Sequence, residues 1–298
     1  MEISSISNQH QKRKLNSQVS RILQQNTLSG ATLQLKSQDR PRKSEKTRRQ
    51  RRNRLIYGLI CLTILAVLIS SYVLLHPTET PFNPDEKKAL IIDGLSTTHE
   101  NKTFWWTIQG KLEQEDYITH YCQGGGASDT VNYYRSLPTK GFEIIILRVH
   151  SAINLENGDL AIFTNEKWSD AKASTTYLND ILNDRLARVR VEENSPSYFG
   201  ITPNFIKAMN GRFENTLIIM MGCDGMTTQS MAEAFIQKGA KVYIGWDGPV
   251  IPQYIDVATI KLLEHLVLEK QTISEAITKT VDEVGKDPYY QSTLRYYP

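Results

Sequence analysis

Two short segments in the second half of the chain end in side chains that could act as a nucleophile and a base. Residues 143–151 read EIIILRVHS and residues 217–225 read LIIMMGCDG. Such runs, apolar and largely β-branched, are typical of strands buried on both faces of a parallel sheet. Catalytic groups in open α/β sheets gather at the carboxyl ends of the strands. If the two strands are neighbours, His150 lies beside Cys223, and a thiol with an adjacent base is a covalent catalyst.

The sequence around Cys223 favours a reactive thiol. The thiolate is the nucleophilic form, and its pKa falls beside an imidazolium or a helix N-terminus. A helix is predicted to start near Thr227, shortly after the cysteine. Gly222 and Gly225 would let a substrate approach the backbone, and the N–H of Cys223 could donate to a developing oxyanion. The structural alternative for this residue is a buried, inert thiol.

Among the six histidines, His150 is the preferred base. Its structural alternative is a satisfied histidine at a strand end. His99 and His120 are the other candidates, and His99 follows the first predicted strand, so it could reach the same edge of the sheet. The remaining histidines fall in the N-terminal tail, a proline-rich segment and the C-terminal helices: His10, His76 and His265.

Strands and helices alternate from residue 87 onward. This alternation implies βαβ units and a mostly parallel sheet flanked by helices, an α/β fold. The predicted strands are 88–93, 117–122, 143–150, 216–222 and 241–246. The predicted helices are 101–114, 128–137, 177–191, 203–209, 227–238, 254–270 and 274–284. Residues 151–164 carry Asn157-Gly158 between apolar residues, the strongest short signal for an antiparallel hairpin.

The order of these features resembles the caspase-like cysteine peptidases, which include caspases, metacaspases, gingipains, separases and legumains. The shared features are a strand ending at His and a small residue, a hairpin, a strand ending at Cys-x-Gly, and a helix leading to KGAKVYIG at 238–245. The resemblance covers roughly residues 88–250 and is closest to gingipain-like domains. The whole chain also resembles membrane-anchored prokaryotic proteins. The family implies a dyad of nucleophile Cys223 and proton shuttle His150, a peptide or protein substrate, and no metal or other cofactor.

The resemblance also bears on substrate binding. Caspases and gingipains usually carry Gly after the histidine, and its backbone N–H helps form the oxyanion hole. This chain has Ser151, which keeps the N–H but loses the closer approach that Gly allows. Asp93 and Asp247 lie near predicted strand ends and could line a pocket for a basic side chain, as acidic residues do in the Arg- and Lys-directed members. The alternative for these aspartates is capping or turn formation, which is our interpretation of Asp224.

The three cysteines form no disulfide framework. Cys61 lies in an apolar run, where it is most simply a small hydrophobic residue. In the family's strand order, 2-1-3-4, the strands that carry Cys122 and Cys223 are roughly 14 Å apart. A disulfide needs Cα atoms within about 7 Å, so we expect these two thiols to be free.

The first 54 residues differ in composition from the rest. They hold 14 of the 35 Lys and Arg residues and three of the 32 Asp and Glu residues, so they carry a formal charge of +11 and the remainder carries −8. Residues 1–54 have no aromatic residue and are predicted to be a disordered basic tail. The cluster at 40–54 is interpreted as a topogenic signal, because it abuts a membrane segment. The functional alternative is a contact for anionic lipid or, less favoured, for nucleic acid.

Residues 55–75 are 21 consecutive uncharged, mostly apolar residues, just long enough to span a bilayer. A cleaved signal peptide is shorter and starts nearer the N-terminus, so a permanent anchor is favoured. The basic residues before the segment place the tail in the cytoplasm and residues 76–298 outside the cell membrane. Residues 76–86, with three prolines, are predicted to be a stalk, which leaves 87–298 as the α/β domain.

The sequence therefore predicts a single-pass membrane protein whose outer caspase-like domain is a cysteine endopeptidase. The first alternative is a catalytically silent domain of the same fold that binds peptides or proteins at the cell surface. The second is a polybasic membrane protein that binds nucleic acid. No zinc-ligand spacing, glycosidase carboxylate pair or phosphate loop stands out, since the glycines at 124–126 lack a following Lys-Ser/Thr.

Overall fold

The computed structural model describes residues 56–67, 86–126, 129–155 and 157–298. Residues 20–82 and the remainder of the chain are separate units, and each is described by itself. Residues 56–67 form a helix. Among the described helices, none is long and apolar enough to cross a membrane. The predicted transmembrane segment, 55–75, extends past the described residues at both ends, and the predictions for 1–54 and 76–85 lie outside them.

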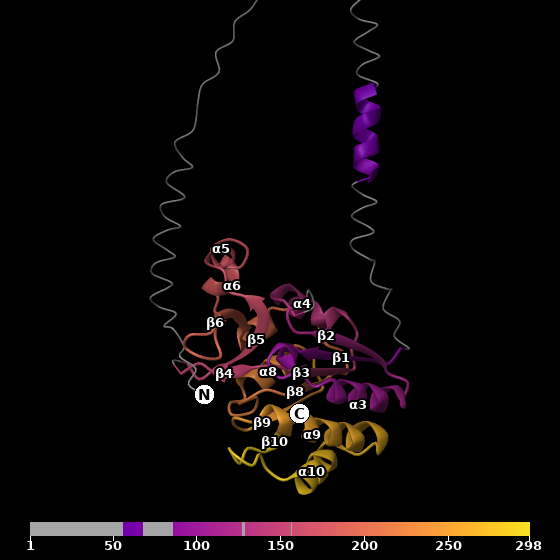
Figure 1. Ribbon diagram of the computed structural model, residues 1–298, viewed down its shortest axis with the longest axis vertical. Coiled ribbons are helices and arrows are strands. Elements are labelled where there is room, and N and C mark those ends of the chain that lie inside the picture. Colours follow the sequence, from indigo (N-terminus) through magenta and orange to yellow (C-terminus); the bar gives the residue numbers. More distant parts are fainter. Residues whose placement is uncertain (1–55, 68–85, 127–128, 156) are drawn as a thin grey trace, which may run out of the picture. The chain divides into compact units, whose positions relative to one another are not determined.

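A six-stranded sheet organises the C-terminal part of the chain (Figure 1). Its strand order is β10-β9-β8-β3-β1-β2, and all neighbours are parallel except β9 and β10. The strands are β1 (Lys88–Asp93), β2 (Ile118–Gln123), β3 (Ile144–Arg148), β8 (Leu217–Met220), β9 (Val242–Trp246) and β10 (Leu294–Tyr297). The mostly parallel sheet expected from the sequence is therefore present, with one antiparallel edge strand in addition.

Successive residues of a strand point to opposite sides of the sheet. In this sheet both sets of side chains are apolar, so helices cover both faces. Ala89 and Ile91 of β1 pack on one side and Leu90 and Ile92 on the other. The first side is covered by α3 (Lys102–Glu113), α9 (Pro252–Leu263) and α10 (Ile273–Val284), which Figure 1 shows together. The second is covered by α4 (Val131–Ser136), α7 (Pro203–Lys207) and α8 (Ser230–Gln237).

A smaller antiparallel sheet follows β3 and adds to the second layer. Its order is β4-β5-β7-β6, from β4 (Ser151–Ile153), β5 (Leu160–Lys167), β6 (Leu186–Val189) and β7 (Tyr198–Ile201). β4 and β5 form the hairpin predicted from Asn157-Gly158. Gly158 adopts a φ of +74°, which a residue without Cβ reaches at little cost. The hairpin begins directly after His150 and so fixes the direction in which the chain leaves β3.

The predicted helix 177–191 is wrong. After α5 (Asp170–Ser174), only the short α6 (Leu178–Leu182) forms there. Asp184 has a φ of 53°, which reverses the chain, and β6 follows. Leu186 and Val189 of β6 are buried against the rest of the small sheet, so tertiary packing outweighs the local helical pattern.

Two other helices differ from expectation in their bounds. The helix predicted from residue 227 begins at Ser230, after turns at 223–229. The helix predicted at 254–270 consists of α9 and a π-helical turn, η3 (Glu264–Leu268). The remaining short segments are the 3₁₀ turns η1 (Gly94–Thr97) and η2 (Leu137–Thr139). The late start of α8 matters for the site, because Cys223 does not stand at a helix N-terminus.

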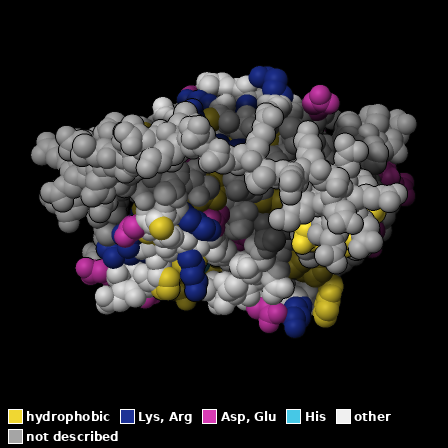
Figure 2. All heavy atoms as spheres, turned by 90° about the horizontal axis from the view of Figure 1, so that it is seen from above, with side chains coloured by type: hydrophobic (Ala, Val, Ile, Leu, Met, Phe, Trp, Pro, Cys, Tyr) yellow, Lys and Arg dark blue, Asp and Glu magenta, His cyan; other side chains and the backbone are white. Residues whose placement is uncertain are grey.

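Charges on the surface are mixed in sign. On the face shown in Figure 2, the Lys and Arg side chains of the described residues are interspersed with Asp and Glu side chains.

Candidate active site

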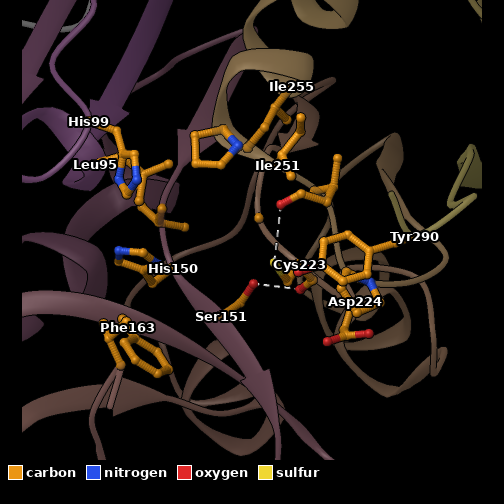
Figure 3. A pocket seen from close by; sticks show the side chains of 16 residues that line it. Leu95, His99, His150, Ser151, Phe163, Cys223, Asp224, Ile251, Ile255 and Tyr290 are labelled. Atoms are coloured by element: carbon orange, nitrogen blue, oxygen red, sulfur yellow. Dashed lines mark hydrogen bonds between the residues drawn. The ribbon is translucent and has the colours of Figure 1, made fainter. Parts of the chain in front are cut away.

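His150 and Cys223 line one pocket at the carboxyl ends of two adjacent strands (Figure 3). β3 and β8 are paired in parallel, with Leu147 opposite Met220. His150 follows the last residue of β3 by two positions, and Cys223 follows the last residue of β8 by three. Parallel neighbours end at the same edge of a sheet, so the pairing brings the two reactive side chains together.

The imidazole of His150 is held in its neutral form. Burial, with smaller contributions from the neighbouring His99 and Arg148, lowers its pKa to about 4. The His99 ring lies edge-on at 6.2 Å between centroids, and Phe163 lies at 6.1 Å. The buried Nε2 atom of His150 has no hydrogen-bond partner among the described residues. A neutral ring with an unpaired nitrogen is suited to accept a proton from a nearby donor.

The thiol of Cys223 is also neutral at rest. Burial raises its pKa, a hydrogen bond to the backbone opposes the rise, and Asp224 and Asp287 add to it. The Sγ atom donates to the carbonyl of Val250 at 3.6 Å. The pKa depression expected from an imidazolium or a helix start is absent, because His150 is uncharged and α8 begins only at Ser230.

Ser151 and Gly222 fix the backbone around the nucleophile. The Ser151 hydroxyl is buried and donates to the carbonyl of Cys223 at 2.5 Å, as Figure 3 shows. A Cβ at Gly222 would lie 2.5 Å from the Ser151 Oγ and 2.7 Å from the carbonyl oxygen of Val149. Ser151 lines the pocket, and its hydroxyl is engaged with the cysteine loop.

Asp224 forms the turn expected of it. Its φ is +60°, and its Oδ1 accepts a hydrogen bond from the Thr227 hydroxyl at 2.9 Å. Its N–H donates to the carbonyl of Gly248 at 2.9 Å, which attaches the cysteine loop to the end of β9.

The two aspartates predicted to bind a basic substrate side chain lie outside the pocket. Asp93 is 1% exposed, and its carboxylate accepts from Arg148 at 2.7 Å and from the Tyr121 hydroxyl at 2.8 Å. Asp247 accepts from the Thr293 N–H at 2.8 Å and from Arg295 at 3.0 Å, which joins β9 to β10. Both carboxylates have partners within the chain, and neither lines the pocket that contains His150 and Cys223.

Arg148, which the sequence interpretation overlooked, lies at the centre of a buried polar network beneath the site. Its Nε and Nη2 bind Asp256 at 2.6 and 2.9 Å, its Nη1 binds Asp93, and its Nη2 also donates to the carbonyl of His99 at 2.9 Å. The Arg148 side chain is 1% exposed. A charged residue that ends an otherwise apolar strand requires buried partners, and this was the signal available in the sequence.

Cys122 and Cys223 are free thiols, and β2 and β8 are separated by β3 and β1. Across the ranges that the structure describes, no group of three or more His, Cys, Asp or Glu residues is arranged to hold a metal ion. Of the alternative bases, His99 lines the pocket, whereas His120 stacks edge-on against Phe142.

Comparison with known proteins places the chain near solved structures of the class that its sequence resembles. The sequence matches no protein-family model and no curated protein. Two gingipain structures are similar to it: the pro- and mature-domain complex of RgpB from Porphyromonas gingivalis and the Arg-specific cysteine proteinase gingipain R. Their sequence identities are 15% and 13%, their TM-scores are 0.41 and 0.42, and 70% and 72% of this chain is covered.

The Drosophila initiator caspase Dronc is a third similar structure, at 7% identity and a TM-score of 0.36, covering 71% of this chain and 78% of its own. The chain spans about half the length of the gingipain chains, 47% and 48%. Caspase-like cysteine peptidases are thus among the solved structures to which this chain is similar.

Proposed function

We propose that this chain is a cysteine endopeptidase, anchored in the cell membrane by a single span, with Cys223 as nucleophile and His150 as general base. The observation that supports the proposal is the placement of a neutral imidazole and a thiol in one pocket at the ends of adjacent parallel strands. A peptide or protein whose main chain enters this pocket would meet both groups. The proposed reaction needs no cofactor.

In the proposed reaction the thiol proton passes to His150 as Sγ attacks the carbonyl carbon of the scissile peptide bond. The oxyanion that forms is stabilised by backbone N–H groups beside the nucleophile, those of Cys223 and Ser151. The protonated His150 then gives its proton to the leaving amine, and the C–N bond breaks to leave a thioester. Water, deprotonated by His150, hydrolyses the thioester and restores the thiol.

The location belongs to the same proposal. The uncharged segment 55–75 and the basic residues before it favour a cytoplasmic N-terminus and an extracellular C-terminal domain. The cluster at 40–54 would lie next to the inner leaflet, where its positive charges favour anionic lipid headgroups.

The second candidate function, a catalytically silent domain that binds peptides or proteins, is favoured by two observations. The thiol pKa is raised, and Ser151 occupies a position where caspases and gingipains usually have Gly. A silent domain and an enzyme both bind peptide, so only covalent reactivity at Cys223 distinguishes them.

A peptide carrying a thiol-reactive ketone tests the proposal on the full-length protein. For an enzyme, we expect one label per chain, at Cys223, with no label at Cys61 or Cys122. Cys223→Ala should abolish labelling, and His150→Gln should slow it roughly 100-fold or more, the usual contribution of a general base. Labelling that is equally fast in the His150 variant would support the silent domain.

A further inference from the structure

The walls of the pocket that contains His150 and Cys223 are mostly apolar. Apolar side chains from separate parts of the chain supply them, among them Leu95, Val149, Phe163, Val250, Ile251 and Ile255. Figure 3 shows Leu95, Phe163, Ile251 and Ile255 arranged around the space beside the two reactive groups. These residues come from η1, from the residue after β3, from β5 and from the start of α9 with the segment before it, so the apolar lining is a property of the assembled site and not of one element.

Charged groups are scarce in this pocket. Among its described lining residues there is no Lys or Arg, and Asp224 is the one carboxylate. Burial raises the Asp224 pKa, and its carboxylate already accepts a hydrogen bond from Thr227. Arg148, which lies beneath the site, is fully engaged with Asp93, Asp256 and the His99 carbonyl. Neither an acidic nor a basic substrate side chain would find a well-placed partner of opposite charge.

The covalent geometry of a bound peptide places one of its side chains next to the reacting bond, and so in this pocket. In a peptide, the Cα of the residue on the acyl side is bonded directly to the carbonyl carbon that the sulfur attacks. The side chain of that residue therefore lies within a few ångströms of Sγ. Since Cys223 itself lines the pocket, this side chain enters it when the carbonyl is in place. The cavity of about 190 Å³ is smaller than the roughly 300–1,000 Å³ typical of cofactor or drug sites, and suits one side chain.

We propose that the peptidase is selective for substrates with an uncharged apolar side chain, such as Leu or Phe, on the acyl side of the scissile bond. This inference rests on the proposed function, and it replaces the preference for Arg or Lys that the strand-end aspartates suggested. A charged side chain in the pocket would lose its hydration without gaining a partner, whereas an apolar one gains from leaving water.

Four peptidyl acyloxymethyl ketones that differ only in the residue next to the ketone, Leu, Phe, Arg or Asp, test the selectivity on the full-length protein. Labelling forms a bond between Sγ and the methylene carbon while the acyloxy group leaves as a carboxylate, and the thiol proton passes to His150. The second-order rates with Leu or Phe should exceed those with Arg and Asp roughly tenfold or more. Fastest labelling by the Arg or the Asp probe would overturn the inference.

A pair of matched variants examines the lining directly. Val191 lines the pocket and is only partly buried, so a polar residue there should be tolerated. Val191→Asp should raise the rate with the Arg probe relative to the Leu probe, whereas the similarly sized Val191→Asn should not. If Arg is preferred in the wild type and Asp224→Asn removes that preference, the carboxylate of Asp224 determines selectivity and the apolar walls do not.

A binding measurement separates this inference from the proposed function. Unreactive amides of the same four peptides are titrated into Cys223→Ala, which removes the chemistry and keeps the pocket. Tighter binding of the Leu and Phe peptides would support apolar selectivity, even if no ketone labels the wild type. Absence of labelling would contradict the peptidase proposal but not the selectivity of the pocket. Equal binding of all four, or tighter binding of a charged peptide, would overturn the selectivity.

Discussion

At the scale of single residues, the site pairs a neutral thiol with a neutral imidazole. Burial is the main cause for both, because a low-dielectric environment disfavours the charged form of each group. The thiol of Cys223 is therefore not ionised before the substrate binds. Proton transfer to His150 accompanies attack, and the acid–base behaviour of His150 sets the lower limit of the active pH range.

The first prediction concerns this limit. Only neutral His150 can accept the thiol proton, so kcat/KM should stay high as pH falls below 6.5 and should decline as pH passes through about 4. The variant His99→Gln removes one of the groups that lower the His150 pKa, so kcat/KM of this variant should begin to decline at a higher pH. A pH profile of kcat/KM for a peptide substrate measures both. An acid limb near 6.5 in the wild type would contradict the assignment.

The same pKa shift affects stability. The folded-state pKa of His150 lies below the value of about 6.5 expected for an unfolded chain, so the unfolded state binds protons first. The free energy of unfolding is therefore unaffected by this group above about pH 6.5 and falls as pH drops from there toward 4. Replacing His150 by Gln should flatten that part of the stability curve in urea titrations at several pH values. An unchanged slope would show that other groups control acid unfolding.

The second prediction concerns Ser151. Its hydroxyl holds the carbonyl of Cys223, and Ser151→Ala should cost about 1 kcal/mol of unfolding free energy, the usual net value of such a bond. It should also reduce kcat more than it raises KM, because the bond positions the nucleophile loop and does not contact substrate. Urea unfolding and steady-state kinetics measure the two effects. Ser151→Thr, which retains the hydroxyl, is the matched control. An equal loss of stability and kcat in both variants would mean that packing at this position, and not the hydrogen bond, is responsible.

At the scale of elements, the network around Arg148 joins parts of the fold that carry the site. Arg148 ends β3, Asp93 ends β1, Asp256 lies in α9, and Asn101 at the start of α3 donates to Asp256 at 2.9 Å. The bond from Arg148 to the His99 carbonyl connects the network to the pocket wall. Three charged groups are fully buried here, and this is sustainable because each is paired and hydrogen-bonded.

The third prediction follows from that pairing. Arg148→Met leaves Asp93 and Asp256 buried without their cation, and should lower the free energy of unfolding by about 3–5 kcal/mol. The control is Arg295→Met, which removes the partially exposed ion pair with Asp247 and should cost less than about 1 kcal/mol. Denaturant titrations compare the two variants. Equal small losses would mean that water or other groups replace the guanidinium at little cost.

At the scale of the whole molecule, the arrangement of charge along the chain sets the expected orientation. The basic residues at 40–54 precede the uncharged segment 55–75, and the domain that follows is acidic overall. The fourth prediction is that protease added to intact cells removes the C-terminal domain and leaves the N-terminal tail protected. Immunoblots with tags at each end measure this. Protection of the C-terminal tag in intact but not in permeabilised cells would reverse the orientation.

A fifth prediction separates the tail from the site. If residues 1–54 serve membrane topology or lipid contact, a chain lacking them should retain the labelling rate of Cys223 by a peptidyl ketone. The matched control is a full-length chain in which the basic residues of 40–54 are replaced by Gln. Loss of labelling in both proteins would tie the basic cluster to the activity, and would favour a function other than a self-contained outer peptidase.

The sequence by itself determined the parallel strands of the main sheet, most of the helices and the two reactive positions. Apolar runs that stop at His150 and Cys223, the Asn157-Gly158 turn and the alternation of elements are local signals. The structure contains the corresponding strands, the hairpin and all predicted helices except 177–191. The position of a residue at a strand end follows from the same pattern. For this reason the convergence of His150 and Cys223 on one pocket could be inferred before the fold was known.

The tertiary structure decided what each strand-end side chain contacts. Asp93 looked available for substrate, but Arg148 and Tyr121 occupy its carboxylate, and the fold brings Arg148 and Asp256, 108 positions apart, within hydrogen-bond distance. The segment 186–189 became a strand because β7 offered it a partner. The apolar pocket arises from η1, β5 and the start of α9 together. Local sequence patterns report backbone preference and burial, whereas these contacts depend on which distant groups pack against each other.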